Sequence, residues 1–446
     1  MNEKKEYFHF IYFVNINITI QTTDPELAQA LENELHRERE GLEMIPSENF
    51  VSPAVLEALG SVGTNKYSEG FPGKRYYGGN TCIDVIETLA QTRAKTLFGV
   101  SHANVQPYSG SPANQAVCFA LLKPGEKLMG LNLTYGGHLT HGWKVNFSGT
   151  YYESVQYVTD PDGWLNYDTL AKQVLEERPK LLFVGATAYP RIFDWARLSE
   201  VARSVDAYLV ADISHIAGLI VGGVHPSPVG YADVITTTTH KTLRGPRGAM
   251  ILCNGEPSEP MKTPPERSRQ YLPTMIDRAV FPGLQGGPHN HQTAAIAVAL
   301  HEASQPAFKE YAVQVVQNAK TLATELSNRQ FHLVTGGTDN HLLLIDLTNK
   351  NIGGADAEKA LDRAGITVNK NTIPNDPRKP YDPSGIRLGT PPLTTRGMKE
   401  KEMILIAEWI NEAIIHWSHR EKLDDIRRKV KELTGQFPLY PELRYV

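Results

Sequence analysis

Lys241 stands where a reactive amine is expected in this sequence. It follows a β-branched run that begins at Val234, and Gly245, Pro246 and Gly248 come shortly behind it. A strand that ends here would deliver the lysine into an irregular turn, where α/β proteins commonly keep their reactive groups. A lysine amine whose pKa falls on desolvation is a nucleophile toward carbonyl groups and can form a Schiff base. A solvated or phosphate-pairing lysine is the alternative.

A carboxylate ends the preceding strand-like segment. The apolar run that starts at Ala207 stops at Asp212, and His215 follows three residues later. Enzymes that use pyridoxal phosphate (PLP) need a lysine for the cofactor aldehyde and a carboxylate that keeps the pyridine nitrogen protonated, so that the ring accepts electrons. Asp212 and Lys241 end successive strand-like segments 29 residues apart. This arrangement suits one cofactor held across neighbouring strand ends.

Two further segments have the composition of binding loops. Residues 103–117 predict a strand, a turn and a helix, with Ser109, Gly110 and Ser111 at the helix start. Free backbone N–H groups and the helix dipole attract an anion there, such as the PLP phosphate, although an ordinary N-cap looks the same. Residues 67–79 are dense in Tyr, Gly, Lys and Arg, which indicates a loop at a site or a solvated surface loop.

Two histidines, His138 and His141, lie three residues apart in a glycine-rich segment. This spacing raises the question of a metal, but no third Cys, His or carboxylate stands at a suitable spacing, so we expect no zinc site. A glycine-rich fingerprint of the GxGxxG type is also missing, which disfavours a dinucleotide-dependent oxidoreductase.

The composition is that of an ordinary globular protein. The 446 residues are 41% hydrophobic and 21% charged with a formal net charge of −4, which argues against a dedicated nucleic-acid or membrane surface. Three cysteines, Cys82, Cys118 and Cys253, are scattered without CxxC spacing, as is typical of a reducing cytosol. We therefore expect a cytoplasmic protein that binds neither nucleic acid nor membranes.

The first 23 residues form a stretch of their own. Two lysines precede an apolar run from Phe8 to Ile20, but polar residues interrupt the run, no small-residue cleavage site follows, and it is too short to span a bilayer. We interpret residues 1–23 as an extra β-prone arm or a misassigned start. Deletion of residues 1–21 is expected to leave activity intact.

Apolar periodicity predicts the elements that position these residues. Strands are predicted at 127–131, 180–185 and 207–211, with helices at 167–177 and 195–204. Strands alternating with helices indicate an α/β fold with a mainly parallel central sheet and helices on both faces. An amphipathic helix over 24–40 begins at Asp24 and Pro25. Helices are also expected at 289–304, 307–328, 355–364, 396–418 and 421–433, a strand at 341–347, and a turn-rich segment at 369–381.

Four segments of the sequence closely resemble serine hydroxymethyltransferases. They are residues 66–79, 136–142, 236–248 and 281–288, and the likeness runs in order from about Leu27 to about Tyr440. The resemblance implies a PLP enzyme of fold type I, the aspartate aminotransferase-like fold, with a smaller C-terminal α+β domain. The expected division is an extra arm (1–23), an N-terminal helical segment (24–60), a large PLP-binding domain (61–304) and a small C-terminal domain (305–446).

This resemblance also implies a reaction. The hydroxymethyl carbon of serine would pass reversibly to tetrahydrofolate, leaving glycine and 5,10-methylenetetrahydrofolate. The family forms homodimers with shared active sites, and a tetramer stays open. Two other functions are kept as alternatives: a folate-independent PLP aldolase that acts on threonine-like substrates, and a catalytically silent PLP-binding or RNA-binding relative, which the presence of all transferred catalytic residue types disfavours.

Individual roles follow from the same resemblance. Glu69 would transfer a proton to or from the serine hydroxyl and the folate, and Arg387 would clamp the substrate carboxylate. Tyr67 and Glu69 are expected to come from the other subunit. Gly286 and Gly287 are expected to complete the phosphate site of the neighbouring subunit.

The implied catalytic residues are Lys241, Glu69, Tyr67, Tyr77, His138, Asp212, Thr238 and His240. The implied PLP-binding residues are Lys241, Ser109, Gly110, Ser111, His138, Thr187, Asp212, His215, Tyr67, Gly286 and Gly287. The implied substrate-binding residues are Ser47, Tyr77, His215, Arg387 and Glu69, and the implied folate-binding residues are Leu133, Gly137, His138, Leu139, Asn371, Lys379, Pro380 and Tyr381.

A few positions depart from the pattern that the resemblance leads us to expect. Thr187 stands where serine is usual, and Ser214 and Pro392 each stand where alanine is expected. Ala249 replaces a glycine and does not readily adopt the positive φ that glycine allows. A local turn that requires a positive φ at this position would be disturbed. His141 is expected to be structural.

Overall fold

The computed structural model of the chain describes residues 19–256 and 268–446. Residues 1–18, which are most of the predicted N-terminal arm (1–23) and of the segment proposed for deletion (1–21), lie outside the described residues. The last residues of the arm, Ile20–Thr23, form a short helix, α1, rather than β structure.

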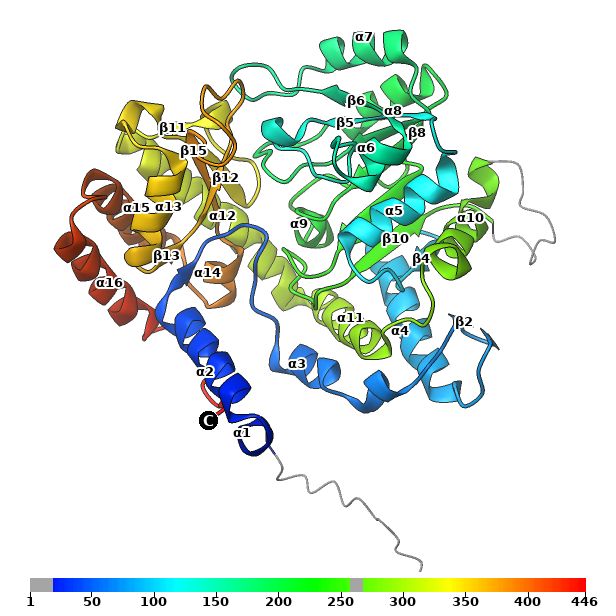
Figure 1. Cartoon of the computed structure of the whole chain (residues 1–446), viewed down its shortest axis with the longest axis horizontal. Coiled ribbons are helices and arrows are strands. Elements are labelled where there is room, and N and C mark those ends of the chain that lie inside the picture. The colour runs from blue at the N-terminus through cyan, green and yellow to red at the C-terminus, as the bar shows by residue number, and fades with distance from the viewer. Residues whose placement is uncertain (1–18, 257–267) are drawn as a thin grey trace, which may run out of the picture.

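The larger part of the molecule is built on a seven-stranded sheet (Figure 1). Its strands follow the order β4-β10-β9-β8-β7-β5-β6. The pairs from β9 through β8, β7 and β5 to β6 are parallel, whereas β10 runs antiparallel to both of its neighbours. The mainly parallel sheet expected from the sequence is therefore confirmed. The strands are β4 (His102–Asn104), β5 (Lys127–Leu131), β6 (Glu153–Tyr157), β7 (Leu181–Val184), β8 (Tyr208–Asp212), β9 (Val234–Thr238) and β10 (Ala249–Cys253).

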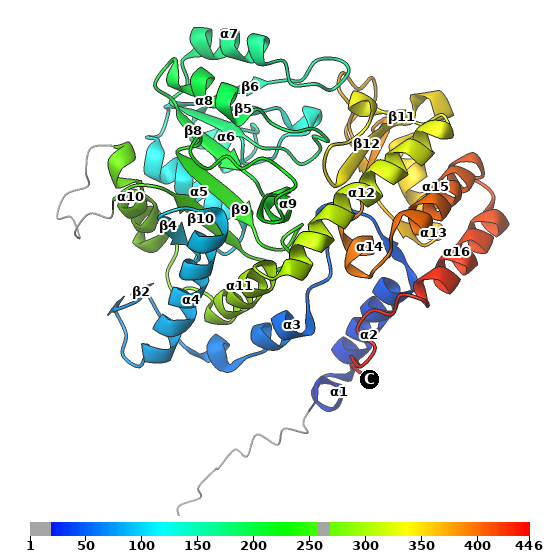
Figure 2. The same ribbon diagram turned by 180° about the vertical axis from the view of Figure 1, so that it is seen from behind.

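Helices cover both faces of this sheet (Figure 2). In β7, Leu182 and Val184 pack into one core, and Leu181 and Phe183 pack into the core on the opposite face. A strand buried on both faces needs a continuous apolar run, which is the pattern that the sequence shows. The first core includes α4 (Thr81–Phe98), α7 (Tyr167–Glu177), α8 (Trp195–Arg203), α9 (Ala217–Val221) and α11 (Asn290–Ala303), and the second includes α5 (Gly110–Leu121) and α10 (Leu272–Arg278).

The smaller part contains a four-stranded antiparallel sheet in the order β11-β12-β15-β14. A long helix, α12 (Pro306–Asn328), joins the two parts, because its first half packs in the core of the large sheet and its second half in the core of the small one. The remaining elements of this part are β11 (His332–Leu333), β12 (Leu342–Asp346), α13 (Gly354–Arg363), β13 (Ile366–Thr367), β14 (Asn369–Asn371), β15 (Gly385–Gly389), α14 (Pro391–Thr395), α15 (Glu400–Ile415) and α16 (Arg420–Thr434).

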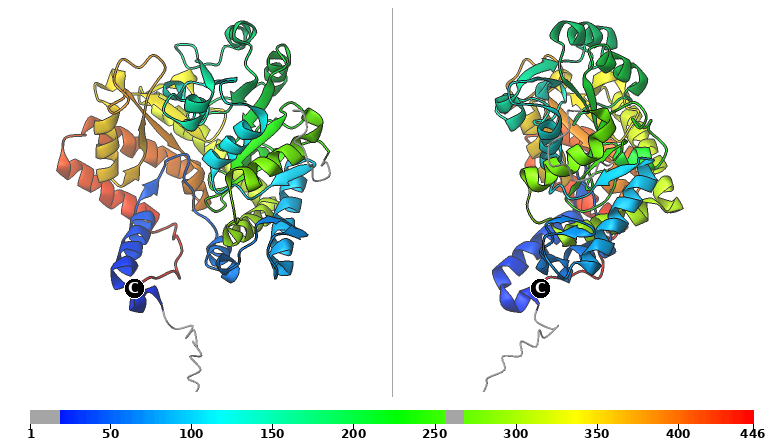
Figure 3. Two further views of the ribbon diagram at one scale, coloured as in Figure 1. Left: turned by 45° about the vertical axis from the view of Figure 1, so that its right-hand side comes forward. Right: turned by 90° about the vertical axis from the view of Figure 1, so that its right-hand side faces the viewer.

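The N-terminal segment is attached to the smaller part. Helix α2 (Pro25–Glu40) stands away from the body of the molecule (Figure 3), and β1 (Leu42–Glu43) pairs in parallel with β13. Asp24 caps α2 by accepting a hydrogen bond from the Leu27 N–H, as its position in the sequence predicts. Short elements connect this segment to α4: α3 (Pro53–Leu59), η1 (Val62–Asn65), β2 (Gly70–Phe71) and β3 (Lys74–Arg75).

Most predicted elements occur within a few residues of their expected bounds. The largest error is the helix expected over 396–418, because the chain turns at 396–399 and α15 begins only at Glu400. The segment from Asn369, expected to consist of turns, begins with the short strand β14. Ala249 is the first residue of β10, so it needs no positive φ and the turn is not disturbed.

Arg396 ties the ends of two helices together. The buried guanidinium donates to the carbonyl oxygens of Glu38, Arg39, Gly41, Thr434 and Phe437. The carbonyls of Glu38, Arg39 and Thr434 lie in the last turns of α2 and α16, where the helix leaves them without intrahelical partners, and the other two lie just beyond the helix ends. We expect Arg396→Met to lower the free energy of unfolding by about 3 kcal/mol or more. Urea denaturation should show this loss, whereas Arg427→Met, on the exposed face of α16, should change stability by less than about 0.5 kcal/mol.

Candidate active site

Lys241 and Asp212 line the same pocket, at the carboxyl ends of the neighbouring parallel strands β8 and β9. Asp212 is the last residue of β8, and Lys241 lies three residues beyond the end of β9. Carboxyl ends of parallel strands meet at one edge of a sheet, which brings together residues 29 apart in the sequence. The pocket is lined by Gly110, His138, His141, Ala186, Thr187, Asp212, Ser214, His215, Thr238 and Lys241.

The surroundings of Lys241 favour a free amine. Burial lowers the pKa of Lys241 to about 8, against the opposing attraction of Asp212, and the nearby cations Arg387 and Arg247 lower it further. The backbone of the lysine is held as well, because Asn49 donates from Nδ2 to the Lys241 carbonyl oxygen at 3.0 Å. The lysine is therefore anchored at its backbone, while its amine is prepared for reaction with a carbonyl group.

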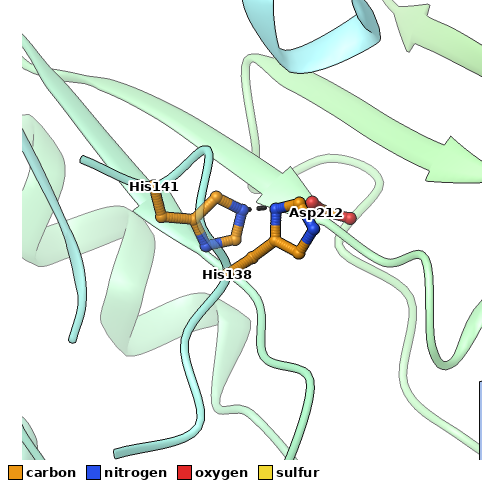
Figure 4. Close-up of side chains that lie close together, drawn as sticks. All are labelled: His138, His141 and Asp212. Carbon is orange, nitrogen blue, oxygen red and sulfur yellow. Dashed lines mark hydrogen bonds and ion pairs between the residues drawn. The ribbon is translucent and has the colours of Figure 1, made fainter. Parts of the chain in front are cut away.

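Asp212 accepts hydrogen bonds from four donors. Its Oδ1 accepts from the backbone N–H of Ser214 at 3.1 Å and from the Ser214 hydroxyl at 2.5 Å. Its Oδ2 accepts from Asn114 Nδ2 at 2.8 Å and lies 3.1 Å from Nε2 of His141 (Figure 4). Burial alone would raise the pKa of Asp212, but the bond to His141 and the nearby His138 and Lys241 hold it well below its usual range. The carboxylate is thus fixed in place and ionised.

The two histidines of the glycine-rich segment meet this carboxylate. His138, His141 and Asp212 each offer a ligand atom within 4.8 Å of the others. The expectation that no third ligand accompanies the histidines was therefore wrong as geometry, because Asp212 is far away in sequence and adjacent in space. His141, expected to be structural, is a direct partner of Asp212. Burial lowers the pKa of His138 to about 4, so that this ring is neutral at physiological pH.

The residues of this pocket fit the phosphate and ring of PLP. Helix α5 begins at Gly110 on the pocket wall, and the side chain of its N-cap residue, Ser109, makes no capping hydrogen bond. A Cβ atom at Gly110 would lie 2.7 Å from the Thr238 side chain, so only glycine fits there. An uncapped helix N-terminus, an amine and an ionised carboxylate in one pocket match the phosphate, the aldehyde and the ring nitrogen of PLP.

Arg387 lies at the junction of the two parts, on β15, and is buried. Its Nε donates to Asn369 Oδ1 at 2.9 Å, and its Nη1 donates to the backbone carbonyl of Thr187. Burial lowers the pKa of Arg387 to about 10, so it remains charged at neutral pH. These bonds orient the guanidinium through Nε and Nη1. The predicted substrate residue Ser47 lies on the segment that follows β1, next to Glu48, whose charge acts on Arg387.

A second group of predicted site residues lies apart from this pocket. Tyr67 contacts Gly287, whose added Cβ atom would lie 3.2 Å from the Tyr67 ring, and Glu69 Oε1 is 3.2 Å from the corresponding position at Gly286. The Tyr67 and Tyr77 rings pack edge to face with centroids 5.1 Å apart. The Glu69 carboxylate raises the pKa of Tyr67. None of these five residues lines the pocket of Lys241. Within one chain, the predicted site residues are therefore divided between two groups.

The predicted folate residues lie on two facing segments. Leu133 belongs to the short helix η2 (Leu133–Tyr135), and Asn371 ends β14. Two hydrogen bonds join the segments: the Thr372 hydroxyl donates to the Thr134 carbonyl at 2.9 Å, and the Tyr135 hydroxyl donates to Asn375 Oδ1 at 2.7 Å. Four other residues of this set are exposed, namely Leu139, Lys379, Pro380 and Tyr381. Position 137 requires glycine, because a Cβ atom there would collide with the Leu131 carbonyl oxygen.

The remaining predicted residues are divided between the pocket and its surroundings. Thr187 and Thr238 line the pocket, and the Thr187 hydroxyl donates to the Gly137 carbonyl at 2.9 Å. His240 does not line it, and burial lowers the pKa of this histidine to about 3. Ser111 lies one residue into α5. Nothing in the structure explains the proline at position 392.

Sequence reasoning did not find two partners of Asp212. Asn114 lies in the first turns of α5, and its amide bridges Asp212 and Thr140. Ser214 was noted only as a departure from the expected residue, although its hydroxyl contacts Asp212 and accepts from the Thr238 N–H at 3.1 Å. The signal for Asn114 was a polar residue on the buried face of an otherwise apolar helix, where an amide needs partners.

The fold and the pocket define a PLP-dependent enzyme of fold type I. Residues 20–410 match the sequence profile of the family described as serine hydroxymethyltransferase. The chain is 56% identical over 426 residues to the serine hydroxymethyltransferase of Acidothermus cellulolyticus, an alignment that covers 94% of this chain and 96% of the relative. It is 52% identical to that of Desulfotalea psychrophila, covering 96% and 97%, and 53% identical to that of Legionella pneumophila (strain Lens), covering 95% and 98%. The chain belongs to the serine hydroxymethyltransferase family.

This membership confirms the fold type, the PLP dependence and the use of tetrahydrofolate as co-substrate that the resemblance implied. Nothing in the comparisons favours a folate-independent aldolase or a catalytically silent relative. Within residues 19–256 and 268–446, no helix is both long and apolar enough to cross a membrane.

Proposed function

We propose that this chain transfers the hydroxymethyl carbon of serine to tetrahydrofolate, reversibly, and that the pocket of Lys241 and Asp212 performs the reaction. The observation that carries the proposal is the convergence of amine, ionised carboxylate and uncapped helix N-terminus in one pocket of a chain of this family. Bound PLP supplies an aldehyde for the substrate amine and a protonated ring that takes up the electron pair released when the Cα–Cβ bond of serine breaks.

The side chains of the pocket have separate tasks in this proposal. Lys241 would hold the cofactor aldehyde through its amine. Asp212 would keep a proton on the ring nitrogen, a role that needs a fixed anion, and the four donors around the carboxylate support it. Neutral His138 is suited to stack on the ring, and Ser109, Gly110 and Ser111 to bind the phosphate. Arg387 binds the substrate carboxylate.

A direct assay distinguishes this function from the nearest alternative. The purified protein, loaded with PLP, should form methylenetetrahydrofolate from serine and tetrahydrofolate. It should also exchange the α-proton of glycine faster when folate is added. Cleavage of threonine-like substrates with no folate effect on either reaction would instead indicate the folate-independent aldolase.

Arg387→Lys tests the substrate clamp. A lysine keeps the positive charge but lacks the planar fork that forms two parallel hydrogen bonds to a carboxylate, and it cannot hold both Asn369 and the Thr187 carbonyl. We expect kcat/KM for serine to fall at least about tenfold, equivalent to about 1.4 kcal/mol. Steady-state kinetics at varied serine concentration measure this effect. Saturation by serine at wild-type concentrations would contradict the assignment.

We also propose that the active enzyme is a homodimer with shared active sites; a tetramer is the alternative. Tyr67, Glu69, Gly286 and Gly287 form a group away from the pocket of their own chain, and a partner subunit would bring its copy of that group to the pocket. Two features support this proposal. Tyr67, Tyr76 and Tyr77 are exposed on the isolated chain, and α2 projects from the body with most of its surface uncovered (Figure 3). Large exposed aromatic side chains are typical of a surface that meets a partner.

Mixing two inactive variants tests the shared site. Lys241→Arg and Glu69→Gln damage different halves of the site, so a hybrid dimer contains one intact site and one doubly damaged site. Unfolding and refolding an equimolar mixture should restore about a quarter of wild-type activity, because random pairing makes roughly half of the dimers hybrids. Each variant refolded alone is the control. No recovery, despite hybrid dimers being present, would show that each chain forms its own site.

Two further assignments accompany this function. We propose an N-terminal helical segment over residues 24–60, a large PLP-binding domain over 61–304 and a small domain over 305–446. The pairing of β1 with β13 joins the first part of the segment to the small domain, and α3 packs against α11 of the large one. We propose a cytoplasmic location, supported by the three free cysteines, of which Cys118 and Cys253 are buried.

A further inference from the structure

The segment between β1 and α3 passes between the two parts of the molecule (Figure 1). Near its start, the Met44 carbonyl accepts from the Gly389 N–H at 2.8 Å, which ties the segment to β15 of the small part. Further along, the Asn49 side chain reaches Lys241 of the large part through its Nδ2 and Thr395 of the small part through its Oδ1. One amide therefore joins the loop of the reactive lysine to the small part.

All four hydrogen-bonding positions of the Asn49 amide are used. Its Nδ2 donates to the Lys241 carbonyl at 3.0 Å and to the Tyr311 hydroxyl at 2.9 Å. Its Oδ1 accepts from the Phe50 N–H at 2.9 Å and from the Thr395 hydroxyl at 2.7 Å. A backbone carbonyl only accepts and a backbone N–H only donates. The contacts to Lys241 and Phe50 therefore admit a single orientation of the amide.

The Lys241 carbonyl also accepts a hydrogen bond from within its own turn. The Arg244 N–H donates to it at 3.1 Å, and Arg244 has a φ of 59°, in the left-handed region. This bond closes the turn but moves with it, whereas Asn49 lies 192 residues earlier in the chain. The next residue, Thr242, is held separately, because its hydroxyl donates to the His215 carbonyl at 2.9 Å. The contact to Asn49 thus acts on the position of the lysine itself.

We propose that Asn49 is a positioning residue whose amide holds the Lys241 backbone in place for the reaction of the lysine amine with the cofactor aldehyde. This proposal rests on the role of Lys241 in the proposed function. In that reaction the neutral amine nitrogen forms a C=N double bond to the aldehyde carbon, and the aldehyde oxygen leaves as water with the two amine protons. Without the amide, Lys241 adopts further positions in the free protein, and the loss of that freedom opposes bond formation.

Two forms of the cofactor separate this role from a general support of the pocket. Pyridoxine phosphate carries an alcohol in place of the PLP aldehyde, so it enters the same pocket but cannot form the bond to Lys241. Equilibrium dialysis against the cofactor-free protein gives both dissociation constants. We expect Asn49→Asp to weaken PLP binding at least about tenfold and pyridoxine phosphate binding less than about threefold. The aspartate has the shape of asparagine, but it turns an oxygen without a proton toward the Lys241 carbonyl.

Asn49→Ala separates the lost hydrogen bond from the added charge. It removes the donor without adding a carboxylate, and it should weaken PLP binding about fivefold with the same selectivity. Thr395→Val is the matched control. It removes a hydroxyl that donates to Asn49, but the Phe50 N–H still fixes the amide and the bond to the Lys241 carbonyl remains. Both dissociation constants should therefore stay within about threefold of the wild type.

Serine kinetics give a second readout. The bond to Lys241 must break and form again in each turnover, whereas Arg387 binds the serine carboxylate. Asn49→Asp should therefore lower kcat about tenfold and leave KM for serine within about threefold.

Equal weakening of PLP and pyridoxine phosphate binding, or unchanged PLP binding in both Asn49 variants, would overturn the proposal. If Asn49→Asp does not fold, Asn49→Ala decides. The dialysis uses neither serine nor folate, so it tests Asn49 even if the protein does not convert serine. A wild-type protein that binds PLP no more tightly than pyridoxine phosphate would instead refute the role that the proposed function gives to Lys241.

Discussion

Lys241→Arg should lower the rate of serine conversion by at least about 10³-fold. Arginine retains a positive charge near Asp212, but a guanidinium stays protonated in proteins and does not attack carbonyl groups. A lysine with a pKa of about 8 is different. At pH 7.5 about a quarter of such amines are neutral, compared with roughly 0.1% at the usual pKa of about 10.4.

Formation of methylenetetrahydrofolate measures the loss in Lys241→Arg. The same variant should also lose the absorbance band of the lysine–cofactor adduct, while its thermal unfolding temperature, measured without cofactor, should be close to that of the wild type. A matched control is Lys172→Arg, because the Lys172 side chain is exposed on α7, where it pairs with Glu176. Retention of most of the activity by Lys241→Arg would remove the basis of the whole functional proposal.

Asp212→Asn should lower turnover by about 10² to 10³-fold and weaken PLP binding. An amide cannot hold a proton on the ring nitrogen by charge. It also places an NH₂ group among four donors that all point at the carboxylate oxygens. Turnover and the PLP dissociation constant measure these losses. Ser214→Ala is the control, because it removes only one of the four hydrogen bonds and leaves the carboxylate ionised, and it should cost less than about tenfold.

Mildly acidic pH should not reproduce the loss of PLP affinity expected for Asp212→Asn. The folded-state pKa of Asp212 is depressed, so its contribution to stability is complete above the unfolded-state value of about 3.9 and is lost only as the pH falls toward the lower folded-state pKa. Between about pH 5 and 7 the carboxylate stays ionised. A fall in PLP affinity between pH 7 and 5 would have to come from the titration of another group. If PLP were lost near pH 6 and the titrating group were shown to be Asp212, this result would contradict its depressed pKa.

The pattern of residues along the chain predicted most strands of the large sheet, but neither β6 nor β10. Strands in the middle of the sheet, such as Leu181–Val184, are short apolar runs buried on both faces, and such a run is a local feature. The reactive ends of β8 and β9 were predicted for the same reason. The helix expected over 396–418 was wrong at its start because periodicity continues through residues 396–399, where Arg396 instead turns inward to bind carbonyl groups.

The sequence by itself determined the fold class, the reactive lysine, its carboxylate and the family. Those features depend on residue types at fixed local spacing and on motifs that are continuous in the chain. Only the tertiary structure decided which distant side chains meet: Asn114, His141 and Ser214 around Asp212, Asn49 behind Lys241, and His341 against His215. Hydrogen bonds depend on distances of about 3 Å between atoms, and those distances are set by how strands and helices pack, which no spacing along one chain records.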